Sequence, residues 1–124
     1  METVKSYRDL KVWQRAMDLA VAAYELTRGF PRDEQFGLTS QIRRATVSTA
    51  ANIAEGYGRS TKGAYLSFLR IAQGSLKEVE THLILATRVS VCTETATKPL
   101  LEETDELGRM LRALIVRLEQ HVDR

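Results

Sequence analysis

The chain has 124 residues, of which 44% are hydrophobic and 27% charged, the composition of an ordinary globular domain. Its single cysteine, Cys92, cannot form an internal disulfide, so nothing in the sequence requires an oxidising compartment. We find no secretory signal, and no run approaches the roughly 18–20 apolar residues that a membrane span needs. We therefore expect a cytoplasmic protein without a membrane partner.

Charge is distributed unevenly along the chain, although the net charge is only +2. Residues 1–36 balance six basic against six acidic side chains, and residues 91–124 hold five basic against seven acidic. Residues 37–90 hold seven basic against three acidic side chains. An electrostatic partner site is therefore expected in the middle of the chain.

The first half of the chain predicts two helices, over about residues 9–28 and 33–57. Asp9 is a candidate cap for the first, in which apolar residues recur at alternating steps of three and four. Gly29-Phe30-Pro31 should end it. Asp33 and Glu34 would occupy the first turn of the second helix, where carboxylates favour the positive end of the helix dipole.

The second half predicts two further helices, over about residues 61–89 and 99–122. Ser60 or Thr61 can cap the third helix, and the β-branched, polar stretch 90–98 is expected to be a loop. Pro99 suits the first turn of the fourth helix. Four helices with short connections predict an all-α, antiparallel up-down-up-down four-helix bundle that forms one domain over residues 1–124.

The second helix carries a polar stripe, because Gln41, Ser48, Asn52 and Glu55 share one of its faces. This stripe could form a site inside the bundle, with Glu55 as acid or base, or a hydrogen-bonded layer that fixes helix register. No histidine, cysteine or second carboxylate accompanies Glu55 on that helix, which favours the layer. Gly74, in the middle of the third helix, suggests close packing within the bundle or between subunits, and the alternative is a tolerated glycine on a solvent face.

Catalytic and metal sites find little support in the sequence. His82 and His121 lack the Glu-x-x-His spacing of di-iron bundles, and Cys92 has no nearby basic neighbour. The turn Gly56–Gly63 resembles a phosphate loop in composition but not in spacing. We expect no enzyme activity, no metal and no cofactor.

The basic side chains form the constellation with the most plausible partner. They project from the second and third helices and the turn between these helices, where Tyr57 and Tyr65 could stack on bases. An ordinary solvated face is the alternative, and charge alone does not separate the two. The candidate nucleic-acid-binding residues are Arg43, Arg44, Arg59, Lys62, Arg70 and Lys77.

At these residues the chain resembles the four-helix bundle proteins encoded in intervening sequences of 23S rRNA genes, which are related to the accessory variability determinant of diversity-generating retroelements. The resemblance covers about residues 7–89. The chain departs from it at Thr49-Ala50, where relatives tend to have Ile-Pro, and a proline there would kink the second helix. The motifs that carry the resemblance are Asp9-Leu-Lys-Val-Trp13-Gln, Phe30-Pro31, Gly37-Leu-Thr-Ser-Gln-Ile-Arg-Arg-Ala45, Asn52-Ile-Ala-Glu-Gly56, Gly58-Arg59, Phe68-Leu69 and Gly74-Ser75-Leu76.

The resemblance implies a homo-oligomer, with a barrel-like pentamer among relatives, that binds nucleic acid through a basic surface. It carries over Arg43, Arg44 and Arg59 as family arginines, and implies no enzymatic activity. The retroelement relative partners a reverse transcriptase. We therefore expect a homopentamer that binds RNA or DNA or acts as an adaptor. The alternative is a structural module that docks a protein, such as a reverse transcriptase, without binding nucleic acid.

Overall fold

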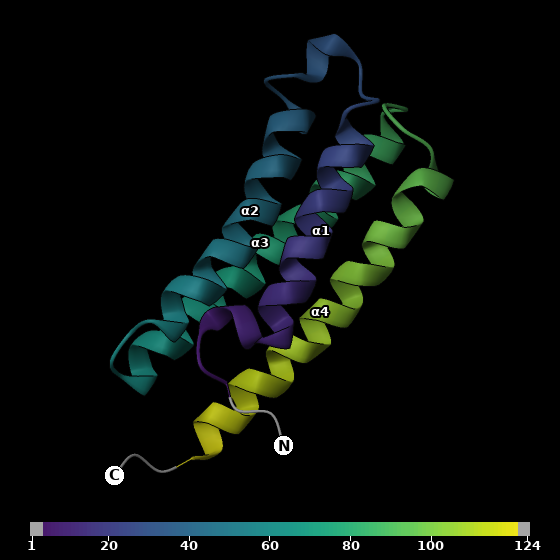
Figure 1. The fold of residues 1–124 in the computed structure, drawn as a ribbon. Coiled ribbons are helices and arrows are strands. Elements are labelled where there is room, and N and C mark those ends of the chain that lie inside the picture. The colour runs from purple at the N-terminus through teal and green to yellow at the C-terminus, as the bar shows by residue number, and fades with distance from the viewer. Residues whose placement is uncertain (1–3, 122–124) are drawn as a thin grey trace.

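The computed structural model describes residues 4–121, and within that range every regular element is helical. Successive α-helices run in opposite directions (Figure 1), which confirms the predicted all-α, up-down-up-down four-helix bundle. The elements are the short 3-10 helices η1 (Tyr7–Asp9) and η2 (Arg32–Glu34) and the α-helices α1 (Lys11–Thr27), α2 (Leu38–Tyr57), α3 (Lys62–Arg88) and α4 (Glu94–Gln120).

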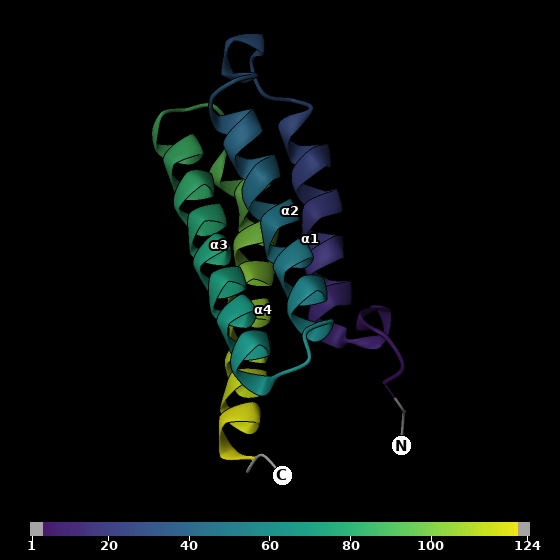
Figure 2. The ribbon, with the colours of Figure 1, turned by 90° about the vertical axis from the view of Figure 1, so that its left-hand side faces the viewer.

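Each helix packs against its neighbours in sequence, and α1 also packs against α4. In the described part of the chain, neither α1 and α3 nor α2 and α4 approach each other closely. The four helices therefore occupy the corners of a square, as Figures 1 and 2 show from two sides. The face formed by α1 and α2 thus lies opposite the face formed by α3 and α4.

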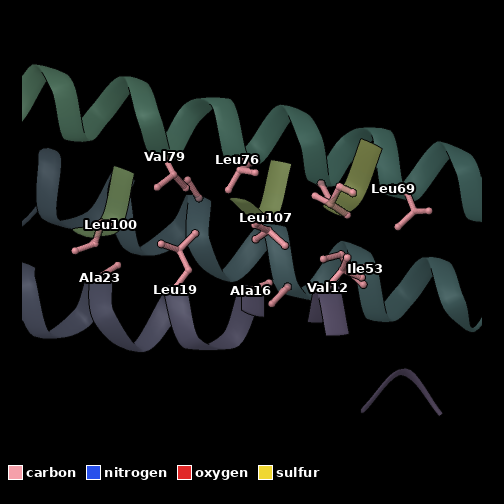
Figure 3. Packing of buried hydrophobic residues seen from close by; sticks show 14 of the residues in the cluster. Val12, Ala16, Leu19, Ala23, Ile53, Leu69, Leu76, Val79, Leu100 and Leu107 are labelled. Atoms are coloured by element: carbon pink, nitrogen blue, oxygen red, sulfur yellow. The ribbon is translucent and has the colours of Figure 1, made fainter. Parts of the chain in front are cut away.

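The hydrophobic core runs the length of the bundle and draws on all four helices (Figure 3). Leu19, Ile53, Val79 and Leu107, one from each helix, are fully buried. Burying a side chain of this size stabilises the fold by about 1.5–3 kcal/mol. The helical spacing of apolar residues in the sequence is the direct cause of this core.

The most extensive helix contact joins α2 and α3, and Gly56 lies in a tight part of it. A Cβ atom on this buried glycine would lie only 2.7 Å from Cβ of Phe68 and 3.2 Å from Cδ1 of Tyr65. Gly74 differs, since it is exposed and a Cβ there would meet nothing within 4 Å. The expectation that Gly74 allows close packing within the bundle is therefore wrong, which leaves a contact between subunits or a tolerated glycine on a solvent face.

The first two helices begin later than expected. Asp9 does not cap α1, because its carboxylate accepts hydrogen bonds from the amides of Lys5 (2.9 Å) and Ser6 (3.2 Å) and so stabilises η1. Asp33 and Glu34 belong to η2 rather than to the first turn of α2. Glu34 still stabilises that helix start, since its Oε1 accepts a 3.1 Å hydrogen bond from the amide of Leu38.

The stretch 90–98 is not entirely a loop, because α4 already begins at Glu94. The hydroxyl of Thr93 caps this helix by accepting a 3.1 Å hydrogen bond from the amide of Ala96. Thr97 is fully buried and bonds to Thr87 of α3 over 3.2 Å, which fixes the new first turn against the bundle. Pro99 therefore lies inside the helix and not in its first turn.

Candidate nucleic-acid interface

Arg43 is held in a fixed position between α1 and α2. Its Nε donates a 2.8 Å hydrogen bond to the hydroxyl of Thr27, and its guanidinium carbon lies 4.4 Å from the ring centroid of Tyr24. Its neighbour Arg44 is exposed and donates a 3.2 Å hydrogen bond to the side-chain oxygen of Gln41. Neither arginine forms an ion pair with any carboxylate of residues 4–121.

These two arginines border a surface hollow of about 470 Å³ between the C-terminal part of α1 and the start of α2. We call it the arginine hollow. Phe36 lies in the turn before α2 and is 88% exposed, the highest value among the exposed large hydrophobic residues described. The hollow therefore combines uncompensated positive charge with an open aromatic ring. Its lining includes Tyr24, Phe36, Ser40, Arg43, Arg44 and Val47.

Three of the other predicted basic residues have carboxylate partners. Arg59 pairs with Glu55 over 3.2 Å, Lys77 pairs with Glu80 over 2.9 Å, and Arg70 pairs with Glu119 of α4. The hydrogen bond with Glu80 raises the pKa of Lys77. These exposed pairs add little stability, but each compensates a charge that would otherwise face a polyanion.

The six predicted basic residues do not form one continuous surface. Lys62 donates a hydrogen bond to the backbone carbonyl of His121, and Arg70 pairs with α4, so both lie toward the α3–α4 side. Arg43 contacts α1 and thus lies on the opposite side of the bundle. Arg59 follows the far end of α2, roughly 24 Å along the helix axis from Arg43.

The aromatic residues near the basic surface also differ from expectation. Tyr57 and Tyr65 pack edge to face with ring centroids 5.9 Å apart, and burial raises the pKa of Tyr65 to about 12. Tyr24 and Phe36 instead accompany the arginines. Tyr24 falls within the helical spacing of apolar residues in the first helix, so the sequence gives no sign that it supports an arginine. Phe36 could have been identified from the sequence as a candidate contact residue, since it is an aromatic residue in a polar turn and does not fit the apolar spacing of a helix.

The polar stripe of α2 forms a hydrogen-bonded layer along the seam with α3. The hydroxyl oxygens of Ser48 and Ser75 lie 2.8 Å apart, and Asn52 donates to the Ser48 carbonyl (2.8 Å) and hydroxyl (3.1 Å). Gln41 accepts from Arg44, while Glu55 is exposed and paired with Arg59. The layer links two helices and places no second carboxylate beside Glu55.

An apolar groove of about 500 Å³ continues from the arginine hollow along α1 and α2, and the two share Tyr24 and Val47. Met17, Val21 and Val47 are 40–56% exposed on its walls. A contiguous apolar patch of this kind commonly marks an interaction surface. We call it the α1–α2 groove. Its lining includes Trp13, Met17, Val21, Tyr24, Val47 and Ala51.

Comparison with known families decides the identity of the chain. The model of the 23S rRNA-intervening sequence protein family matches residues 8–113, which include α1, α2, α3 and most of α4. The chain belongs to this family. The match reaches well into the last helix, where the sequence motifs were no longer apparent.

One solved structure shares the fold of this chain. It is a protein of unknown function from the S23 ribosomal protein family of Bacteroides thetaiotaomicron, with 23% sequence identity and a TM-score of 0.75. The alignment covers 84% of this chain and 97% of that one. At this identity the likeness shows the fold alone. The comparison with curated proteins found no match.

This intervening-sequence protein keeps a continuous α2 through Thr49-Ala50, the dipeptide that replaces the Ile-Pro of relatives. Both residues are buried, and the Thr49 hydroxyl donates a 2.8 Å hydrogen bond to the Ala45 carbonyl. The helix therefore needs no kink there. Of the arginines carried over by resemblance, Arg43 and Arg44 meet in the arginine hollow, and Arg59 is separate.

Two kinds of reactive group were considered in the sequence, a metal site and the thiol of Cys92. Within residues 4–121, no three His, Cys, Asp or Glu side chains lie together as a metal site would need. Burial raises the pKa of the Cys92 thiol, which disfavours the reactive thiolate.

None of the described helices is both long and apolar enough to cross a membrane.

Proposed function

We propose that this chain is a non-catalytic, cytoplasmic, homo-oligomeric protein that binds nucleic acid through the arginine hollow. The observation that carries the proposal is the pairing state of the basic residues. Arg43 and Arg44 form no ion pair with a carboxylate among the described residues, whereas Arg59, Arg70 and Lys77 each form one.

The geometry of Arg43 suits a phosphate group. Because Nε is occupied by Thr27 and one guanidinium face by Tyr24, both terminal nitrogens are left to donate to an anion. A planar guanidinium can bind phosphate oxygens in bidentate fashion. Fixing the side chain before binding lowers the entropy lost on association. The Arg43 side of the hollow is thus pre-organised to bind phosphate.

The proposed oligomer would use the surface centred on α2. Met17 and Val21 of α1 and Val47 of α2 are exposed along the α1–α2 groove, while Ile71 is exposed on α3, where Gly74 offers room for a close neighbour. One such face docking on a different face of the next copy closes a ring when the rotation fits. Five subunits are what the family resemblance implies. Repetition around a ring would multiply the charge of the arginine hollow.

A pair of charge-matched variants tests the nucleic-acid proposal. R43Q/R44Q and R109Q/R112Q remove the same charge, but the second pair lies on α4, where Arg109 already faces Glu106. In fluorescence-anisotropy titrations with RNA and DNA, the first variant should lose at least tenfold in affinity and the second should stay near wild type. Equal losses would mean that net charge, and not the hollow, determines binding.

The α1–α2 groove favours a second candidate function, the docking of a protein partner such as a reverse transcriptase. A Val21→Glu substitution would place a charge on its apolar wall without touching the buried core. If docking is the function, V21E should abolish the protein complex while R43Q/R44Q retains it. Docking through apolar surface should also persist at high salt, where phosphate binding weakens.

A further inference from the structure

We propose that the arginine hollow selects single-stranded nucleic acid, with one base stacked on Phe36 and the adjoining phosphate bound by Arg43 and Arg44. This inference rests on the proposed function and adds the class of nucleic acid to it. It is carried by an open aromatic ring and two uncompensated guanidinium groups on one hollow.

Phe36 is presented by an ordered turn and not by a loose loop. The amide of Gln35 donates to the Arg32 carbonyl (3.1 Å), and the amide of Gly37 donates to the Glu34 carbonyl (3.0 Å). Glu34 also accepts from the Leu38 amide, which ties the turn to the start of α2. The backbone on both sides of Phe36 is thus fixed while its ring stays in solvent, the arrangement that a stacking platform needs.

Tyr24 and Phe36 have different roles in the hollow. The Arg43 guanidinium already covers one face of the Tyr24 ring, so Tyr24 serves to position the arginine. Among residues 4–121, Phe36 takes part in no ring–ring or cation–π contact. The ring that is available to a base is therefore that of Phe36.

The combination favours a single strand over a duplex. In a duplex the bases are stacked on each other, so a side chain on a protein surface reaches their faces only after unstacking. Unpaired bases splay out and stack on aromatic rings, while basic groups follow the backbone. The hydroxyl of Ser40 and the amide of Gln35 also line the hollow and can bond to base edges.

The competing occupant of Phe36 is an apolar surface of another copy, because the α1–α2 groove adjoins the hollow. The charge of the site argues against it. An apolar contact would remove water from the charges of Arg43 and Arg44 without supplying a carboxylate, which is strongly unfavourable. A single strand supplies a phosphate for the two arginines and an exposed base for the ring of Phe36.

The test compares three labelled ligands of equal length with the full-length protein: a single-stranded RNA, an abasic strand with the same backbone, and a duplex. Phe36→Ala should lower affinity for the single strand about 5- to 150-fold, the effect of losing one stacked base. Affinity for the abasic strand and the duplex should not change. Phe36→Tyr should restore binding, and Ile84→Ala, another exposed apolar truncation, should behave as wild type.

The outcomes separate this inference from the proposed function. If F36A binds the single strand as tightly as wild type while R43Q/R44Q does not, the stacking inference is overturned and the proposed function stands. A lower oligomer mass of F36A in light scattering would also overturn it, since Phe36 would then be a subunit contact. If wild-type protein binds none of the ligands at low salt, both fail.

Discussion

The side chains of Arg43 and Tyr24 join α2 to α1, with the guanidinium carbon 4.4 Å from the ring centroid. Thr27, one turn further along α1, accepts the Nε hydrogen bond of the same arginine and is itself buried. Arg44 has no comparable support beyond Gln41 of its own helix. Two adjacent arginines of the same motif therefore differ in how firmly they are held.

This difference predicts unequal effects of two conservative substitutions. Arg43→Lys keeps the charge but loses the planar contact with Tyr24 and the Nε hydrogen bond, so RNA affinity should fall about tenfold. Arg44→Lys keeps a flexible exposed cation and should lose less than threefold. Anisotropy titrations with RNA would measure the loss of affinity in each variant. A larger loss in R44K would show that the fixed position of Arg43 has no part in binding.

A second prediction concerns the two helical glycines, which serve as controls for each other. Gly56→Ala inserts a methyl 2.7 Å from Cβ of Phe68, so α2 and α3 must move apart. Overpacking of this kind costs about 1–3 kcal/mol, partly offset by the better helix propensity of alanine. The free energy of unfolding in urea should fall by about 1–2 kcal/mol.

Gly74→Ala should have the opposite effect, because the new methyl meets open space on an exposed helix. Alanine there should raise the free energy of unfolding by about 1 kcal/mol. Light scattering adds a second measurement to this variant. If Gly74 lies against another subunit, G74A should reduce the oligomer mass. Equal destabilisation by both substitutions would contradict the assigned positions of the two glycines.

The half-buried phenol of Tyr65 predicts a loss of stability at alkaline pH. Burial raises its pKa to about 12 in the folded protein, against about 10 in the unfolded chain. Below pH of about 10 the phenol is neutral in both states. Between about 10 and 12 the unfolded state releases the proton first, so folding stability falls as pH rises.

Tyr65→Phe should remove this part of the pH dependence, and the latest step of the tyrosine absorbance titration should disappear with it. If the variant keeps the same alkaline loss of stability, Tyr65 is not its source.

Pro99 predicts a gain of stability on substitution. It lies in the second turn of α4, where it cannot donate the hydrogen bond that the Thr95 carbonyl would otherwise receive. Pro99→Ala should restore that bond and raise the free energy of unfolding by about 1–3 kcal/mol. Urea denaturation measures the difference. Unchanged or lower stability would indicate that α4 does not extend before Pro99 in solution.

The sequence predicted the bundle well because apolar residues at helical spacing lie on one face of a helix, and that face packs into the core. Leu19, Leu76 and Leu107 each belong to the apolar spacing of their own helix, and all three are buried. The start of α4 was missed because its first turn is stabilised by contacts distant in sequence, above all the bond between Thr87 and Thr97. Pro99 then gave a stronger local signal for a helix start than Thr93 did.

The candidate site was only partly predictable from the sequence. The sequence singled out Arg43 and Arg44, but it could not show which basic residues have carboxylate partners. Arg70 finds Glu119 on α4, 49 residues away, and only the packed bundle brings the two together. Tyr24 likewise fits the apolar period of α1 and yet supports an arginine of α2.

The salt dependence of RNA binding tests the central claim most directly, because each phosphate contact releases counterions. In a plot of log affinity against log salt concentration, R43Q/R44Q should have a slope smaller than wild type by about 0.7 for a single strand, the effect of losing one phosphate contact. R109Q/R112Q should keep the wild-type slope. Unchanged slopes in both variants, or equal reductions in both, would contradict the account in which the arginine hollow holds the phosphate backbone.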